Sequence, residues 1–268
     1  MSRRVMRHPH CTPVDAKPAM KPTPHHSKHC HLCGRRLRGR AWVHAPGATH
    51  LGSASHPEQN IIVCRQCEET APRCDVCNLP MGENHVRLPD DRRICPRCHQ
   101  TAIYDPTQAR ELFERVTHIA TDQLGLGLNV GTEFTLVDHQ HLQRLATEAP
   151  AGPHDDAGKV IGLFTRKGRQ RVMYLLYGLP QILFIQVAAH EWGHAWHREN
   201  CPLLDDLLLC EGFAEWVAHK ALQTLGATRQ ATLMEQRDGL YGEGLRKMLS
   251  LERQRGISGV LDFCRRSE

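Results

Sequence analysis

The pattern of apolar and polar residues changes partway along the chain. From residue 104 onward apolar residues recur at the periods of helices and strands. Residues 106–124 carry apolar side chains three and four apart, with Asp105 and Pro106 in the cap and first-turn positions of that helix. The other predicted elements are strands at 129–137, 159–165 and 171–177, a polar loop at 148–158, and helices at 138–147, from Pro180, and at about 210–225, 228–239, 243–254 and 258–265. A small sheet followed by helices, with the helix from Pro180 packed under the sheet, is an α+β arrangement.

The first part of the chain has a different composition. Residues 1–28 are rich in proline, histidine and basic residues and have almost nothing apolar to bury, so we expect a disordered tail. Residues 29–103 hold four closely spaced cysteine pairs, and the α+β region fills residues 104–268. We therefore predict a tail, a cysteine-rich module and one larger domain.

Length and net charge restrict the number of domains and the possible partners only slightly. The 268 residues suit one or two domains, and the formal net charge of +5 is weak evidence for a nucleic-acid partner, because zinc-bound thiolates would shift it. The most apolar run, 172–189, is interrupted by Gly178 and Pro180, and residues 1–20 lack the apolar segment of a signal peptide. We therefore expect a cytoplasmic protein with no membrane partner, in which thiols stay reduced and clustered cysteines bind metal.

The segment 190–194 reads His-Glu-Trp-Gly-His within a predicted helix. Two histidines four residues apart lie one turn apart on one helix face and can bind one zinc ion, and Glu191 can then reach a water on that metal. The apolar residues 181–189 predict a buried helix, in which such polar groups are costly unless a metal satisfies them. The sequence thus predicts His190 and His194 as zinc ligands and Glu191 as the general base.

A third ligand is predicted on the next helix. Glu211 follows at a spacing typical of sites with two histidines and one glutamate, which leave a fourth position open for water. That water, its pKa lowered by zinc, would attack a carbonyl while Glu191 takes its proton. Glu215, one turn beyond Glu211, is placed to orient a ligating histidine. The alternative for both glutamates is a solvated acidic face, against which stand their apolar neighbours Phe213 and Trp216.

Four identical cysteine pairs, each separated by two residues, predict two structural zinc sites. Each pair directs two sulfurs at one ion, and two pairs close a tetrahedral site. Sequential pairing gives Cys30, Cys33, Cys64 and Cys67 for the first zinc, and Cys74, Cys77, Cys95 and Cys98 for the second. Such closed sites replace the hydrophobic core that so short a segment cannot build. As an alternative, His44, His50 or His56, which lie between the first two pairs, could replace a cysteine in the first site.

The second cysteine set has the spacing of the second zinc site of a LIM domain, so residues 29–103 resemble a LIM-like treble-clef or zinc-knuckle module. The insert between Cys33 and Cys64 is longer than usual, which makes the match LIM-like rather than strict.

An ordered set of motifs resembles the DA-one family of plant organ-size regulators, which join LIM-type zinc modules to a zinc peptidase. These motifs are Ala71-Pro72-Arg73-Cys74, Tyr177-Gly178-Leu179-Pro180, Ala189-His190-Glu191 with His194-Ala195-Trp196, Glu211-Gly212, and Tyr241-Gly242-x-Gly244-x-Arg246. The resemblance extends from about Cys30 to Leu261. It implies a zincin-like domain that uses His190, His194 and Glu211 as ligands and Glu191 as base.

The resemblance also implies a cytosolic endopeptidase that acts on protein substrates under the control of ubiquitin. The chain has only the second of the family's LIM-like modules, and its short basic tail has no acidic, alanine-centred helix of the ubiquitin-binding kind. The peptidase core therefore matches the family, whereas ubiquitin as a regulatory partner is not supported by these residues.

The oxyanion that develops during peptide hydrolysis needs a donor besides the metal. Tyr241 is the first candidate, with His219 and Arg246 behind it, and the alternative for Tyr241 is a buried tyrosine in a turn. The strand at 171–177 is the predicted edge to which an extended substrate pairs.

Three classes of function remain open. A zinc endopeptidase whose LIM-like module serves docking or regulation is favoured, because a purely structural zinc site has no use for the free carboxylate of Glu191. The second class is a catalytically silent adaptor, in which both zinc regions only hold shape and bind proteins. The third is a nucleic-acid-binding protein, indicated by the basic cluster Arg35, Arg36, Arg38 and Arg40, which a solvated face explains equally well. The favoured class predicts one catalytic and two structural zinc ions, with protein partners and no nucleic acid.

Overall fold

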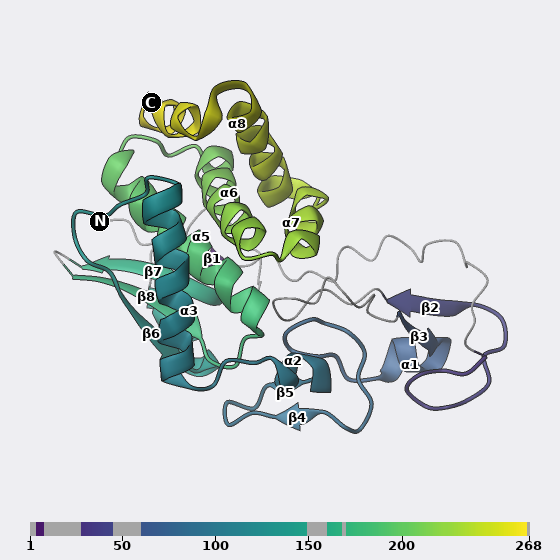
Figure 1. Ribbon diagram of the computed structural model, residues 1–268. Helices are drawn as coiled ribbons and strands as arrows, with labels where there is room; N and C mark the ends of the chain where they lie inside the picture. Colours follow the sequence, from purple (N-terminus) through teal and green to yellow (C-terminus); the bar gives the residue numbers. More distant parts are fainter. Residues whose placement is uncertain (1–3, 8–27, 45–59, 149–159, 168–169, 267–268) are drawn as a thin grey trace.

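The computed structural model describes residues 4–7, 28–44, 60–148, 160–167 and 170–266, and it has the predicted α+β architecture. A four-stranded sheet with helices around it forms the larger part (Figure 1). A cysteine-rich part with two separate two-stranded sheets lies beside it. Within the described residues, no helix combines the length and the apolar character needed to cross a membrane.

The larger sheet has the strand order β1-β7-β8-β6. Its strands are β1 (Arg4–Arg7), β6 (Glu133–Val137), β7 (Val160–Lys167) and β8 (Gln170–Leu176). β7 runs antiparallel to β1 and β8, whereas β6 runs parallel to β8. β8 is buried along most of its length, as expected of a strand that has neighbours on both sides and helices on both faces.

This sheet corrects two expectations. β8 is not an edge strand, because β7 and β6 both pair with it, so an extended substrate cannot add to it. The tail was expected to be disordered, but Arg4–Arg7 pairs with β7. Pairing at a sheet edge uses backbone N–H and C=O groups and needs few apolar side chains, so composition did not reveal it. Residues 1–3 and 8–27 of that tail lie outside the described residues.

Helices cover both faces of the sheet. They are α3 (Pro106–His118), α4 (His139–Glu148), α5 (Gln181–Asn200), α6 (Leu207–Thr224), α7 (Thr228–Glu235) and α8 (Gly239–Arg266). On one face, Phe134 of β6 stacks on Phe113 of α3 with 4.5 Å between ring centroids and meets Phe184 of α5 at 6.5 Å. On the other face, α4 contacts β8 through Tyr174. α6, α7 and α8 lie beyond α5 (Figure 1).

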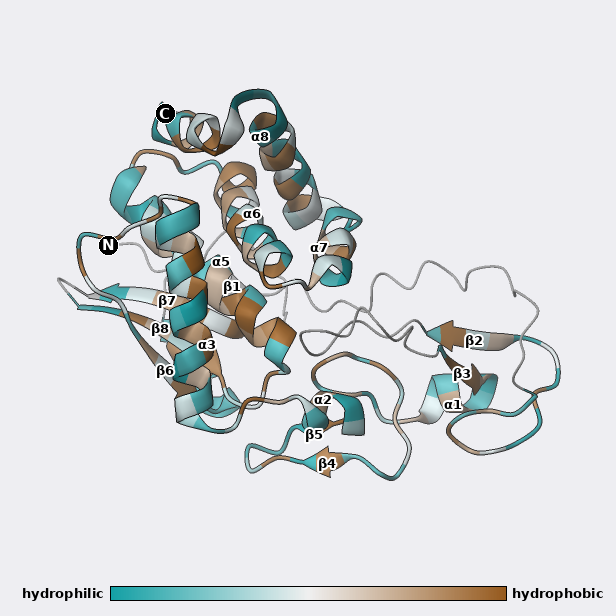
Figure 2. Cartoon of the chain, in the orientation of Figure 1, coloured by the Kyte–Doolittle hydropathy of each residue, from teal (hydrophilic) through white to brown (hydrophobic). Residues whose placement is uncertain are grey.

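α5 is the central helix of this part. It begins after Pro180, as predicted, and nearly all residues from Ile182 to His197 are buried, the histidines and the glutamate of its motif among them. Figure 2 shows apolar residues along α5 and α6, whereas α3 carries alternating polar and apolar bands. A helix that is buried on all sides can present polar groups only to partners inside the protein.

The predicted helices agree with the structure except near their ends. Asp105 caps α3 by accepting a hydrogen bond from the backbone N–H of Gln108 at 2.9 Å, and the helix continues through one π-helical turn at Ile119–Gln123. The two helices predicted at 243–254 and 258–265 lie within α8 on either side of Gly256, a residue with non-helical backbone angles. The φ angle of Gly256 is 69°, a left-handed conformation that glycine adopts without strain.

The cysteine-rich part consists of short elements. They are β2 (Ala41–His44), β3 (Ile61–Cys64), α1 (Arg65–Thr70), β4 (Val86–Arg87), β5 (Arg93–Ile94) and α2 (Pro96–Gln100). β2 pairs with β3 and β4 with β5, both antiparallel. In Figure 1, β4, β5 and α2 lie next to the larger part, and β2, β3 and α1 lie farther from it.

The chain after α2 is bonded to the segment that leads into α5. The N–H of Ile103 donates to the carbonyl of Leu179 at 2.9 Å, the N–H of Gly178 donates to the carbonyl of Ile103 at 3.0 Å, and the N–H of Gln181 donates to the carbonyl of Thr101 at 2.9 Å. The end of the cysteine-rich part and the start of α5 therefore share backbone hydrogen bonds, which fix the position of the motif helix at its first turn.

Candidate metal centres

His190 and His194 lie one turn apart on α5 and are fully buried. Their Nε2 atoms are 2.9 Å apart, and the two rings meet edge to face with 4.6 Å between centroids. The helix spacing alone accounts for this arrangement, because residues four apart share a face. Both Nε2 atoms are therefore directed at one small region of space.

Glu211 on α6 completes a group of three possible ligands. Its Oε2 atom lies 3.3 Å from Nε2 of His190 and 3.4 Å from Nε2 of His194. The three ligand atoms lie within 4.8 Å of one another, and Oε2 of Glu211 is buried beside the two imidazole nitrogens. Two imidazole nitrogens and one carboxylate oxygen around a common point fit a zinc ion with an open fourth position.

Glu191 lies beside this group and is fully buried. Its Oε2 accepts a hydrogen bond from the backbone N–H of Phe164 on β7 at 2.8 Å, and its Oε1 has no hydrogen-bond partner among the described residues. Burial raises the pKa of Glu191 to about 8, against the opposing charge of His190. One oxygen is thus held in place while the other is left available to accept a proton.

The close approach of β7 to Glu191 depends on Gly162. A Cβ atom at this position would lie 2.4 Å from Cγ1 of Val187 and 2.9 Å from Oε1 of Glu191. Any side chain here would push β7 away from α5 and lengthen the hydrogen bond from Phe164. The importance of Gly162 is not predictable from the sequence, because it depends on a contact between a strand and a helix that are distant in sequence.

Glu215, one turn beyond Glu211, contacts the Nδ1 atom of His190, on the side of the ring away from Nε2. Its Oε1 lies 3.0 Å from Nδ1 of His190, and its side chain is 1% exposed. Burial alone would lower the pKa of His190, but hydrogen bonds to Glu211 and Glu215 raise it to about 10. The two carboxylates therefore favour positive charge at this point, as a site for a cation requires.

Tyr241 lies near the same group, on the first turn of α8. Its ring centroid is 6.3 Å from that of His190. Burial, together with the charges of the nearby carboxylates, raises the pKa of Tyr241, so its hydroxyl stays protonated. The other two oxyanion candidates have other contacts: His219 bonds Oε1 of Glu235 at 2.7 Å, and Arg246 donates to backbone carbonyls.

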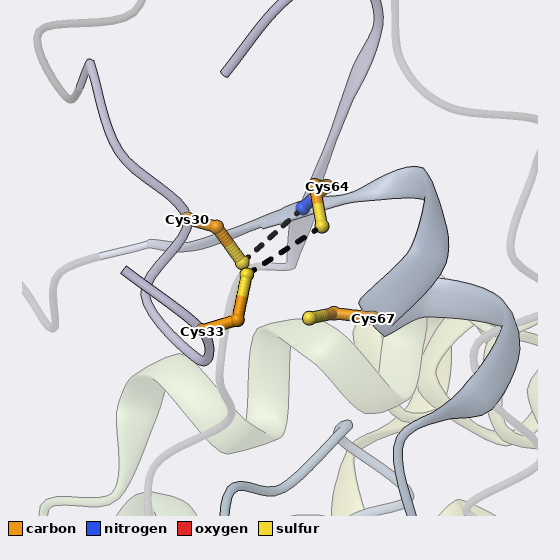
Figure 3. A group of neighbouring side chains, drawn as sticks. All are labelled: Cys30, Cys33, Cys64 and Cys67. Carbon is orange, nitrogen blue, oxygen red and sulfur yellow. Dashed lines mark hydrogen bonds between the residues drawn. The ribbon is translucent and has the colours of Figure 1, made fainter. Parts of the chain in front are cut away.

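The first cysteine group brings together two pairs that are distant in sequence (Figure 3). Its members are Cys30, Cys33, Cys64 and Cys67. The sulfurs of Cys33 and Cys64 are 3.8 Å apart, and the N–H of Cys64 donates to the sulfur of Cys30 at 3.4 Å. Figure 3 shows the sulfur of Cys67 pointing from α1 toward the same space.

The second cysteine group repeats this construction. Its members are Cys74, Cys77, Cys95 and Cys98. The sulfurs of Cys77 and Cys95 are 3.7 Å apart. In each group one pair lies on a tight turn and the other at the start of a short helix, α1 or α2. Four sulfurs within 4.8 Å of one another, with no carboxylate or imidazole among them, fit a closed structural zinc site and a LIM-like module.

Both cysteine turns need a left-handed residue directly after the second cysteine. Gly34 has φ 69° and Asn78 has φ 55°, and the N–H of each donates to the carbonyl of the first cysteine of its pair at 2.9 Å. Glycine and asparagine are the residues that tolerate this conformation. The residue that follows each of these two pairs is therefore a signal for the turn that the sequence itself contains.

Of the three histidines in the first insert, His44 lies within the described residues, and it is not grouped with the cysteines. Nε2 of His44 instead lies 2.7 Å from Oε2 of Glu68. His50 and His56 lie outside the described residues. Within the described residues, four cysteines alone form the first group.

The chain is similar over most of its length to curated plant proteins. Protein DA1-related 7 of Arabidopsis thaliana is 23% identical over 231 residues, which are 73% of this chain and 39% of that protein. Protein DA1 of the same plant is 23% identical over 236 residues, which are 74% of this chain and 44% of that protein. The chain is DA1-like. The LIM domain-containing protein HDR3 of Oryza sativa subsp. japonica is 22% identical over 162 residues, which are 48% of this chain and 32% of that protein.

These matches confirm the family resemblance drawn from the motifs. The DA1-like chain spans 39% and 44% of the length of the first two of these relatives, so the similarity covers less than half of either protein. No protein-family model matches the DA1-like chain, and no solved structure matches it significantly.

Proposed function

We propose that the chain is a zinc-dependent endopeptidase with a zincin-like domain at residues 104–268 and a LIM-like module at 29–103 that docks substrates or regulates the enzyme. The observation that carries this proposal is the free oxygen of buried Glu191 beside His190, His194 and Glu211. A structural zinc site has four protein ligands and no spare acid, as in the two cysteine groups, whereas this group has three ligands and a carboxylate beside them.

Zinc, when bound, supplies Lewis acidity toward a water and toward a substrate carbonyl. The protein supplies the proton acceptor, which is Oε1 of Glu191, oriented because Oε2 is held by the N–H of Phe164. The same carboxyl group then returns the proton to the leaving amine. Glu215 holds Nδ1 of His190, which leaves Nε2 free to face the metal.

Tyr241 provides the hydrogen bond to the developing oxyanion in this proposal. Its hydroxyl stays protonated because burial and the nearby carboxylates raise its pKa, and a protonated phenol donates to an oxyanion. His219 contacts Glu235 and Arg246 donates to backbone carbonyls, whereas the ring of Tyr241 lies beside that of His190.

The test compares casein cleavage by the wild type with cleavage by Glu191→Gln, with zinc content measured on both proteins. We expect the variant to lose a factor of roughly 10²–10⁴ in rate, which is typical of a general base, at equal zinc content. Glu114→Gln, on the exposed surface of α3, is the matched control and should cleave like the wild type.

A catalytically silent adaptor is the second candidate, and the two closed cysteine groups support it, because such sites serve only to hold shape. It predicts that wild type and Glu191→Gln are equally inactive on casein and on peptide libraries at full zinc content. That result would overturn the peptidase proposal.

A further inference from the structure

The turn between α7 and α8 brings a guanidinium group to the carboxylate that supports His190. Nη1 of Arg237 lies 3.5 Å from Oε2 of Glu215, and the other oxygen of Glu215 lies 3.0 Å from Nδ1 of His190. The Arg237 side chain is 23% exposed, whereas that of Glu215 is 1% exposed. A line of contacts thus runs from the partly exposed turn through one buried carboxylate to a candidate metal ligand.

The backbone of this turn is held from α8. Nη1 of Arg246 donates to the carbonyl oxygens of Glu235 at 2.8 Å and of Arg237 at 2.7 Å. These carbonyls lie at and just beyond the C-terminal end of α7, where the helix itself provides no hydrogen-bond donors and a cation is favourable.

Gly242 also packs against the backbone of this turn. A Cβ atom at Gly242 would lie only 1.9 Å from the carbonyl oxygen of Arg237. The first turn of α8 can therefore pack directly on the turn only because residue 242 is glycine. Arg246 and Gly242 together fix the backbone position of Arg237, from which its side chain extends.

We propose that Arg237 is a positioning residue of the metal centre and that Arg246 holds the backbone of Arg237 in position. Arg237 keeps Glu215 oriented with Oε1 on Nδ1 of His190, so that Nε2 of His190 faces the metal. This inference rests on the proposed function only in taking the centre of His190, His194 and Glu211 to bind zinc. It assigns to the Tyr-Gly-Glu-Gly-Leu-Arg segment a role in supporting the metal ligands, in addition to carrying Tyr241.

The contact is a single ion pair rather than a paired set of hydrogen bonds, so charge matters more than the shape of the guanidinium. A lysine at position 237 should therefore rescue the site, whereas glutamine should not. A role in stability alone would not distinguish these two variants by their metal spectra.

The experiment measures zinc affinity by competition with a chromophoric chelator, and the visible absorption of the protein with cobalt in place of zinc. The variants are Arg237→Gln, Arg237→Lys, Arg246→Gln, Glu215→Gln and the double variant Glu215→Gln with Arg237→Gln. The matched control is Arg253→Gln, an exposed arginine on α8. The two cysteine groups contain no residue of this turn and serve as an internal reference.

Loss of a residue that orients a metal ligand typically reduces metal affinity by about 10- to 100-fold, which we expect for Glu215→Gln. For Arg237→Gln we expect a smaller loss of roughly two- to tenfold with an altered cobalt spectrum, because its ion pair is partly exposed. Arg246→Gln should change both readouts in the same direction, and Arg237→Lys and Arg253→Gln should leave both as in the wild type.

The double variant separates this chain of contacts from a general effect on folding. Because Arg237 acts through Glu215, replacing Arg237 should change nothing further once Glu215 is glutamine. The inference is overturned if Arg237→Gln leaves affinity and spectrum unchanged, or if its effect persists in the double variant. If Arg237→Gln does not fold, Arg246→Gln measured in the wild-type and Glu215→Gln backgrounds decides by the same criterion.

Failure of the proposed function gives a different result. If the wild type binds three metal ions but does not cleave casein, the peptidase proposal fails while the metal affinities still test the role of Arg237. If the centre binds no metal in the wild type, this inference fails together with the peptidase proposal.

Discussion

Replacing Gly212 by alanine should separate α6 from α8 and disturb the candidate metal centre, whose ligands lie on α5 and α6. A Cβ atom at Gly212 would lie 2.6 Å from Cα, from the carbonyl carbon and from the carbonyl oxygen of Gly244. All three are backbone atoms, so no side-chain rotation can relieve the overlap. The helices must move apart by about 1 Å to restore a normal carbon–carbon contact of about 3.5 Å.

The net effect on stability combines two opposing contributions. Overpacking of this kind costs about 1–3 kcal/mol, and the better helix propensity of alanine returns about 1 kcal/mol. We therefore expect the free energy of unfolding to fall by up to about 2 kcal/mol, which at roughly 2–4 °C per kcal/mol lowers the midpoint of thermal unfolding by up to about 8 °C. Helix propensity alone would predict the opposite sign.

The metal centre should respond more strongly than the fold. Glu211 precedes Gly212, and zinc–ligand distances tolerate only about 0.2 Å, so a shift of α6 should release the metal from the histidines. Zinc content should fall from about three ions to about two, because the cysteine groups lie elsewhere. The measurements are circular dichroism melting and metal analysis, with the exposed Ser258→Ala on α8 as control. A Gly212→Ala protein as stable as the wild type, with all of its zinc, would refute the close contact.

Two further predictions concern the cysteine-rich part. Arg92→Leu should lower the free energy of unfolding by about 3–5 kcal/mol, measured by urea denaturation, because it leaves the buried carboxylate of Asp90 without its charged partner at 2.8 Å. A loss below 1 kcal/mol would contradict the ion pair's role. Cys98→Ser should remove one zinc ion and lower the melting temperature of the protein. Cys33→Ser should also remove one zinc ion but leave the melting temperature of the larger domain, which contains α5, nearly unchanged. Equal melting curves for the two variants would argue against the bonds between Ile103 and the start of α5.

Patterns within one element predicted most of the fold. The pattern of apolar residues predicts the buried face of α3 and the buried residues of α5. Asp105 and Pro180 lie at the predicted starts of these two helices. The spacing of two histidines on one helix places their Nε2 atoms together without any knowledge of the rest of the structure. These features are local, so a sequence contains them directly.

Features that depend on contacts between distant elements were not predictable in the same way. The pattern of β8 indicates a strand but not which strands lie beside it, so it was taken for an edge. The partner of Arg4–Arg7 is more than a hundred residues away, on β7. Gly162 belongs to none of the motifs and Gly212 only follows a predicted ligand, and the packing of β7 on α5 and of α8 on α6 shows why a side chain does not fit at either position.

The two cysteine groups are alike in construction, but they differ in how they are connected to α5, the helix that carries His190 and His194. The second group leads through α2 into Ile103, which exchanges backbone hydrogen bonds with Gly178 and Leu179 just before α5. Arg92, near that group, also donates to the carbonyl of Tyr177. A zinc ion bound at the second group would therefore help to fix the first turn of α5, the helix that carries His190. The first group has no such connection among these hydrogen bonds, so a change at the first group should disturb the first turn of α5 less than a change at the second.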